Sequence, residues 1–103
     1  MLIYHIVLPE AWEKFKDQPF YAHESLESEG FIHCSYRNQL EEVLERYYKN
    51  AEKVLILHIS PARLDPAAAN LIAERSTGGE VYPHIYGKIN QAAIVNIEER
   101  ILR

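Results

Sequence analysis

Two apolar segments rich in β-forming residues, each closed by a proline, constrain the fold of this chain more than any other feature. Leu2–Leu8 (LIYHIVL) ends at Pro9, and Lys53–Ser60 (KVLILHIS) ends at Pro61. Runs of this length and composition are typical of β-strands. We therefore expect Leu2–Leu8 to be a central strand that begins almost at the first residue, and Lys53–Ser60 to be a strand buried on both faces.

Shorter segments predict the other elements. The strand pattern recurs in Phe31–Ser35, Val81–Tyr86 and Ala92–Ile97. Pro9–Lys16 is expected to be a short helix, because proline suits the first turn of a helix. Ser25–Glu29 is expected to form one helical turn, with Ser25 as its cap and Gly30 as the left-handed residue at its exit.

The clearest helix of the chain begins near Asn38. Glu41 follows three positions later, where a capping box places an acidic residue. Apolar and aromatic side chains then recur at the spacing of one buried helical stripe, and they are Leu40, Val43, Leu44, Tyr47 and Tyr48. Asn50 suits the left-handed position at which such a helix ends.

The segment after Asp65-Pro66 admits two interpretations. This dipeptide and the alanines behind it are typical of a helix cap and first turn, whereas Leu71–Arg75 fits a strand equally well. About six strand-like segments around two or three short helices predict an α+β fold. No repeat, low-complexity tract or linker interrupts the sequence, so residues 1–103 are expected to form a single domain.

The composition excludes several classes of protein. Hydrophobic residues make up 48% of the chain and charged residues 25%, which is ordinary for a globular domain and unlike a disordered one. The formal net charge of -4 argues against a general nucleic-acid surface, which needs a basic footprint. The longest apolar run, Val54–Leu57, is far shorter than the ~20 residues of a membrane span, and no secretory signal is recognised.

The single cysteine bears on both compartment and chemistry. Because Cys34 has no second cysteine in the chain, an internal disulfide is excluded and a reducing, cytoplasmic location is expected. Side chains two apart share a face of a strand, so Ile32 and Cys34 are expected to face the core, opposite Phe31, His33 and Ser35. Cys34 is therefore predicted to be a buried, unreactive thiol.

Several candidate site residues have an alternative, purely structural explanation. Tyr82, His84 and Tyr86 share one strand face, which can line a pocket for a planar ring but is also typical of an aromatic ladder on a half-buried sheet. A mid-strand histidine such as His5 is often a core residue bonded to a backbone carbonyl. Glu74 by itself fits a solvated charge. No metal site is expected, because CxxC, HExxH and a short HxxxH pair are absent, and no glycine-rich phosphate loop is present.

A series of motifs in order along the chain resembles one family. The motifs are IYHI at Ile3–Ile6, Trp12, Ser25-Leu26, EGFIHCS at Glu29–Ser35, Gln39, the VLILHIS strand, Glu74 and PHIYG at Pro83–Gly87. Together they look like the bacterial DUF 952 family of small uncharacterised proteins, over essentially the whole chain. That family is similar in fold to the ADP-ribosyltransferase superfamily, whose members bind NAD in a cleft of a split, mostly antiparallel β core. The resemblance therefore implies an ADP-ribosyltransferase-like α+β fold with two or three short helices.

The resemblance also implies roles for individual residues. In that superfamily a histidine on the first strand holds a ribose hydroxyl, a polar residue on a second strand shapes the nicotinamide pocket, and a late glutamate steadies the ribose during transfer. By position, His5, Ser35 and Glu74 match these roles, which favours a strand over Leu71–Arg75. A nearby carboxylate would stabilise the oxocarbenium-like ribose that forms when nicotinamide leaves.

The sequence thus predicts a pocket for a nucleotide-like or phosphate-sugar small molecule. His5 and Glu74 are the expected catalytic residues, and the expected ligand-binding residues are His33, Ser35, His84 and Tyr86. NAD is the cofactor that the resemblance implies, with ADP-ribosyl transfer or related glycosidic chemistry as the reaction, in a monomeric protein. Two alternatives stay open: a non-catalytic module that binds a metabolite in the same cleft, and an interaction domain that docks a partner chain on the Tyr82–Tyr86 face.

Overall fold

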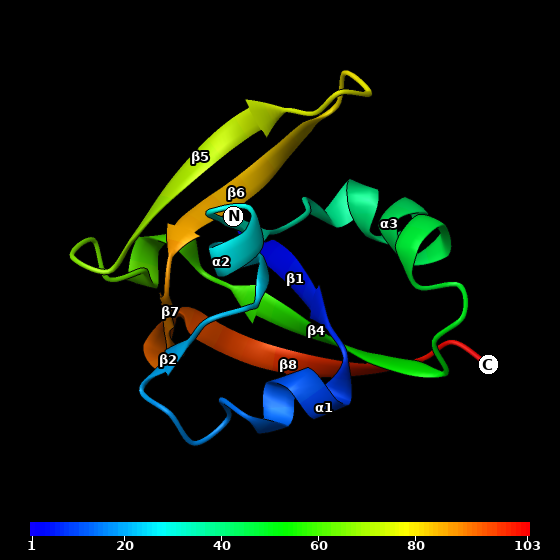
Figure 1. Ribbon diagram of the computed structural model, residues 1–103, viewed down its shortest axis with the longest axis horizontal. Coiled ribbons are helices and arrows are strands. Elements are labelled where there is room, and N and C mark those ends of the chain that lie inside the picture. Colours follow the sequence, from blue (N-terminus) through cyan, green and yellow to red (C-terminus); the bar gives the residue numbers. More distant parts are fainter.

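The computed structural model describes residues 1–103 and contains eight strands in three antiparallel sheets, with three short α-helices (Figure 1). The first sheet has the order β1 (Ile3–Val7), β4 (Lys53–Ile59), β8 (Ile94–Ile101), and the second has the order β3 (Ile32–His33), β6 (Val81–Gly87), β5 (Ala69–Arg75). The third pairs β2 (Phe20–Tyr21) with β7 (Ile89–Asn90). The helices are α1 (Pro9–Glu13), α2 (Ser25–Ser28) and α3 (Leu40–Tyr47), and 3₁₀ turns span Arg37–Gln39, Pro61–Arg63 and Gln91–Ala93. The expected α+β class is confirmed.

Two strands of the β1-β4-β8 sheet, β1 and β4, are covered on both faces, which is why their apolar residues hardly alternate with polar ones. On one face it packs against α3, in a core made of Tyr4, Ile6, Leu40, Leu44, Val54 and Ile56. On the other face lies the larger core, to which the three sheets and α1 contribute, among others, Ile3, Val7, Trp12, Tyr21, Ile32, Leu57, Ile59, Ile85 and Ile89. Burial of β4 on both faces is therefore confirmed. β1 is fully buried but lies at an edge of its sheet, so its predicted central position is wrong.

A short segment after β3 joins the two three-stranded sheets. The Cys34 N–H donates to the carbonyl of Pro83 in β6 at 3.1 Å. Proline has no N–H to donate in return, so the ladder between β3 and β6 cannot continue beyond this pair. The next residue, Ser35, turns to β1 and exchanges two backbone hydrogen bonds with Tyr4, of 2.9 and 2.7 Å. The predicted strand Phe31–Ser35 is shortened to two residues because its second half changes sheets.

The helices differ from prediction at their ends. α1 stops at Glu13, before the expected Lys16. Ser25 lies inside α2 and does not cap it, since Glu24 occupies the N-cap position, whereas Gly30 does adopt the predicted left-handed conformation with φ of 89°.

At α3 the expected capping box of Asn38 and Glu41 does not form. The Gln39 Oε1 atom accepts the Tyr36 N–H at 2.9 Å instead, at the start of the 3₁₀ turn that leads into the helix. Leu40 and Leu44 are buried as predicted, but Tyr47 is 69% exposed. Tyr47 lies beside an open hollow between the end of α3 and the start of α1, where no strand covers it.

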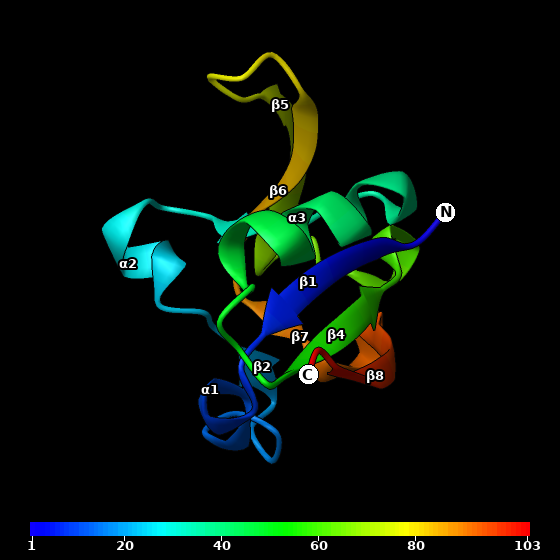
Figure 2. The same ribbon diagram turned by 90° about the vertical axis from the view of Figure 1, so that its right-hand side faces the viewer.

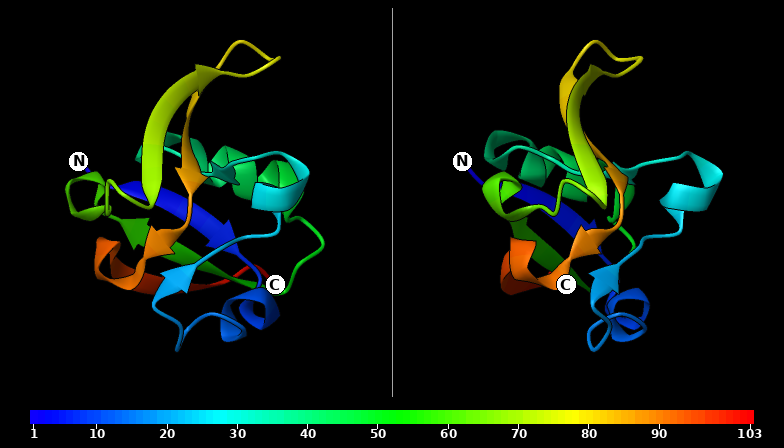
Figure 3. Two further views of the ribbon diagram at one scale, coloured as in Figure 1. Left: turned by 60° about the vertical axis from the view of Figure 1, so that its left-hand side comes forward. Right: turned by 90° about the vertical axis from the view of Figure 1, so that its left-hand side faces the viewer.

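The segment after Asp65-Pro66 forms the strand β5, so of the two interpretations of the sequence the strand is confirmed and the helix is wrong. The Asp65 Oδ1 atom accepts the Ala67 N–H at 3.0 Å. The chain makes only this one turn before β5 begins. β5 starts close to the end of β6, and a Cβ atom at Gly87, where φ is 128°, would lie 2.1 Å from the carbonyl oxygen of Ala68. The β5–β6 hairpin then projects from the body of the molecule, on the side of α2 and α3 (Figures 2 and 3).

None of the helices combines the length and apolar character of a membrane span.

The two sides of α3 give a matched pair of substitutions. We expect Leu44→Ala to lower the free energy of unfolding by about 2–5 kcal/mol, because it opens a cavity in a filled core. Tyr47→Ala, on the same helix but exposed, should change it by less than about 0.5 kcal/mol. Urea unfolding followed by circular dichroism measures both, and equal effects of the two variants would contradict the assigned packing.

The buried thiol gives a second prediction. Cys34 is 3% exposed in the larger core, and burial raises the pKa of its thiol far above the usual value. The thiolate is the reactive form, so native protein should react with a thiol reagent far more slowly than protein unfolded in urea. Fast, stoichiometric labelling of the native chain would show that Cys34 is reachable.

Candidate functional site

Glu74 is the meeting point of a cluster of side chains on the outer face of the β3-β6-β5 sheet. Its Oε1 atom accepts two hydrogen bonds from β6, one from His84 Nδ1 at 2.7 Å and one from the Tyr86 hydroxyl at 2.5 Å. The register explains the contact: Glu74 lies opposite Tyr82, so its side chain shares a face with His84 and Tyr86 and reaches them diagonally.

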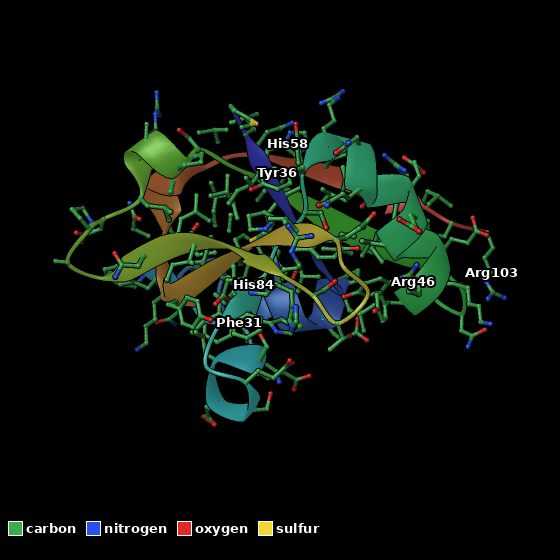
Figure 4. The ribbon with its side chains drawn as sticks, turned by 90° about the horizontal axis from the view of Figure 1, so that it is seen from above. Phe31, Tyr36, Arg46, His58, His84 and Arg103 are labelled. Atoms are coloured by element: carbon green, nitrogen blue, oxygen red, sulfur yellow. The ribbon has the colours of Figure 1, made fainter.

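Two aromatic rings from the β3 side complete this face. The ring of Phe31, just before β3, stacks on the His84 imidazole with a centroid distance of 4.0 Å and an interplanar angle of 18° (Figure 4). His33 lies directly opposite His84 in the register, with 5.5 Å between the ring centroids, and its Nε2 atom lies 3.0 Å from Glu29 Oε2. We call Phe31, His33, Glu74, His84 and Tyr86 the outer-face cluster.

The hydrogen bonds of the cluster define the charge of Glu74 and the His84 ring nitrogen that donates to it. Tyr86 and then His84 donate to the carboxylate, and these bonds lower the pKa of Glu74 below its usual value, so the group is ionised at neutral pH. An ionised carboxylate can only accept, so Nδ1 of His84 carries a proton. In the neutral imidazole, Nε2 then has a free lone pair, and this atom has no hydrogen-bond partner in the protein. The cluster therefore presents an oriented imidazole beside a negative charge.

His5, expected among the catalytic residues, lies in the core. It is 2% exposed, and both ring nitrogens are occupied: Nδ1–H donates to the carbonyl oxygen of His33 at 2.6 Å, and Nε2 accepts the Tyr21 hydroxyl at 2.7 Å. Burial lowers the pKa of His5 to about 3, so the ring is neutral. With no free nitrogen His5 cannot touch a ligand directly, and its contact with the cluster is through the main chain of His33.

Ser35 is also placed differently from expectation. It is 5% exposed, and its main chain pairs with Tyr4 in the bridge between the sheets. The chain turns from one sheet to the other at Cys34, so the alternation that put Ser35 on the face of His33 ends there.

Tyr82 lies on the same face of the β3-β6-β5 sheet as His84 and Tyr86, but its hydroxyl donates to Glu80 and not to Glu74.

Two hollows in the surface lie elsewhere. One is at the junction of α1, the end of α3 and β4, and includes Leu8, Tyr47 and Tyr48. The other includes Met1, Tyr36 and Leu71, on the opposite side of the second sheet from the cluster. Neither hollow is lined by any of the six predicted site residues, so the pocket expected from the sequence lies at neither of the two hollows.

Sequence reasoning missed the partners that hold the site residues in place. Phe31 was placed on the face of His33 by alternation, but its stack on His84 joins residues far apart in the chain. Tyr21, the partner of His5, is 1% exposed and lies on β2, a strand of two residues without a sequence signature. His23 packs edge-on against His5 at 5.1 Å and accepts the Ser25 N–H on Nδ1. No spacing in the sequence links these pairs.

Comparisons with known proteins give one family and one solved protein. A family model described as "Protein of unknown function (DUF952)" matches residues 6–97. The crystal structure of protein CC0527 from Caulobacter crescentus is similar, with a TM-score of 0.83 and 24% identity over 96% of this chain and 85% of that one. The solution NMR structure of CC0527 has a TM-score of 0.76 and 24% identity, over 94% and 82% of the two chains. This likeness shows the fold alone and gives no support to the expected ADP-ribosyltransferase likeness. No curated protein matches the chain.

Removal of the Tyr86 hydroxyl tests the electrostatics of the cluster. In Tyr86→Phe we expect the pKa of Glu74 to rise toward its usual value, because the largest cause of its lowering is gone. A carboxyl pKa that is lowered by folding stabilises the protein above the unfolded pKa, and this contribution is lost as pH falls through the folded pKa. NMR titration of the Glu74 side-chain carboxyl measures the shift. Tyr82→Phe, which removes a hydroxyl bonded to Glu80, is the control and should leave Glu74 unchanged.

Proposed function

Because the chain belongs to the DUF952 family, whose description assigns no activity, we infer its function from the outer-face cluster and propose that this cluster binds a nucleotide-like ligand. The observation that supports the proposal most is the convergence of His84 and Tyr86 on one carboxylate oxygen of Glu74. Such a bond network orients an imidazole and keeps a carboxylate charged at a partly open position, since the side chain of Glu74 is 37% exposed. A purely structural ion pair would not need a second donor and a stacked ring.

The charges of the site favour one kind of nucleotide. Glu74 and Glu29 place two carboxylates beside the imidazoles, and the chain carries a net charge of -4, so a dense cluster of phosphates would be repelled. A planar ring with a positive charge is the better match, because aromatic faces and carboxylates both attract cations. In the proposal Phe31 and Tyr86 contact the ring, and Glu74 faces the sugar. The nicotinamide ribose of NAD has this combination of a cationic ring and a sugar.

The proposed reaction is transfer at the anomeric carbon of that ribose, as in ADP-ribosyl transfer. The bond from the anomeric carbon to the nicotinamide nitrogen breaks, and the electron pair leaves with nicotinamide. The nucleophile forms the new bond and gives up its proton, which the free Nε2 of His84 can accept. Glu74 stabilises the positive charge that develops on the ribose. His5 contributes only through the His33 main chain, which it holds.

A non-catalytic metabolite-binding module is the second candidate, and one observation favours it. The side chain of Glu74 is partly exposed, and the two hollows described above lie elsewhere, so water would have access to a reacting ribose. Binding without turnover of NAD would distinguish this function from transfer.

Titration of the full chain with NAD, ADP-ribose and ribose 5-phosphate tests the proposal, with isothermal calorimetry for binding and release of nicotinamide for turnover. We expect NAD to bind best. Phe31→Ala should weaken its binding about tenfold or more, since a lost ring stack costs about 1–3 kcal/mol. Glu74→Gln should abolish nicotinamide release while leaving the chain folded.

The control for both variants is Tyr82→Phe, which alters the same sheet face outside the cluster. Absence of binding by all three compounds would refute the proposed ligand class. Binding that is unaffected by Phe31→Ala would place the ligand away from the cluster.

A further inference from the structure

β5 is an edge strand whose outer side has no partner. It is hydrogen-bonded to β6 alone, at the end of the β3-β6-β5 sheet. In the ribbon views it forms the outer limb of the projecting hairpin (Figures 1 and 3). A seven-residue strand with an open edge presents a row of unpaired N–H and C=O groups, which is a template for another strand.

The register identifies which backbone groups are open. The Pro83 carbonyl accepts the Cys34 N–H, so the main chain of Pro83 faces β3. Main-chain direction alternates along a strand, so His84 and its neighbours at even positions face β5. Their partners in β5 include Ile72 and Glu74, and the residues between them, Leu71 and Ala73, therefore turn their N–H and C=O groups to the open edge.

The open edge of β5 is apolar at its centre, unlike the other long edge strand. Leu71 is 37% exposed and Ile72 is 45% exposed, and no charged residue lies between Asn70 and Ala73. β8 also exposes apolar side chains, but it carries Glu98, Glu99 and Arg100 in succession, and charges of this kind protect an edge from pairing. β5 lacks this protection over its central residues.

We propose that two copies of this chain associate through β5, edge to edge and antiparallel, about a two-fold axis at Ile72. In this register Ile72 contacts Ile72 of the second copy, and Leu71 exchanges hydrogen bonds with Ala73. Glu74 lies opposite Asn70, whose amide can donate to the carboxylate, and Arg75 lies opposite Ala69. The pairing joins an apolar centre to itself and brings no two like charges together.

Other registers are less complementary. An axis at Ala73 would place Glu74 against Ile72 and Arg75 against Leu71, so each charge would cover an apolar side chain. An axis at Leu71 would leave Glu74 and Arg75 outside the paired region and shorten the ladder. A strand that is complementary to itself in one register fits a second copy better than a peptide of unrelated sequence.

The association goes beyond the proposed function, which needs no second copy, and it replaces the monomer that the sequence led us to expect. The product is one continuous sheet with the order β3-β6-β5-β5-β6-β3 across the two copies. It also brings Asn70 of the second copy beside Glu74, at the border of the outer-face cluster. The two hypotheses are separate, because the mass of the particle can be measured without any ligand.

Analytical ultracentrifugation of the full chain from micromolar to millimolar concentration tests the association. We expect a monomer–dimer equilibrium that Ala73→Pro abolishes: the Ala73 N–H has no partner within the chain, and proline is tolerated at an outward position of an edge strand. Ile72→Lys should also abolish it, by setting two like charges face to face. Ile97→Lys on β8, where exposure is 43%, is the matched control and should leave the dimer intact.

Cross-linking tests the register. Ile72→Cys should form a disulfide between two copies under mild oxidation, since cysteines that face each other in a non-hydrogen-bonded pair are within disulfide reach. Asn70→Cys, on the same face but away from the axis, should not, and Cys34 is buried in both. A monomer at all concentrations, a dimer that survives both edge substitutions, or one that Ile97→Lys disrupts would overturn the proposal. Circular dichroism confirms that each variant is folded.

Discussion

The structure depends on the way in which the main chain of Ile32–Ser35 is shared between two sheets. Cys34 donates to Pro83 on one side, and Ser35 exchanges two hydrogen bonds with Tyr4 on the other. The proline is what makes the sharing possible, because it ends one ladder at the residue where the next begins. The two sheets then enclose the larger core between them, with Ile32 and Ile85 from one and Leu57 from the other all fully buried.

The same segment positions the outer-face cluster. The core histidine His5 donates to the carbonyl oxygen of His33 at 2.6 Å, so the last residue of β3 is held from inside the protein while its side chain points outward. His33 lies opposite His84, and His84 is bonded to Glu74. A buried neutral imidazole thus connects the core to a charged surface group through main chain and register, without a direct contact to any ligand. This arrangement gives the histidine of the first strand a structural role, because it holds the main chain of β3.

The projecting hairpin joins the site to the open edge. Glu74 belongs to β5, the strand that has no outer neighbour, while its partners His84 and Tyr86 belong to β6. A charged residue near one end of β5 thus serves the cluster, and the apolar residues before it stay exposed at the edge. Ligand binding would therefore use the side chain of Glu74, whereas association would use mainly the main chain at the open edge of the same strand.

The sequence by itself determined the elements whose signal is local. The two apolar runs, the strand of PHIYG, the left-handed Gly30 and the buried Cys34 follow from alternation, composition and backbone preference, which act between near neighbours in the chain. Only the tertiary structure decided which of those elements meet. It put Ser35 into the bridge between sheets, enclosed His5 with Tyr21, and brought Glu74 to His84 and Tyr86, because register and the bend at Cys34 arise from pairing between distant strands. A one-residue change in that pairing would have sent each of these side chains to the opposite face.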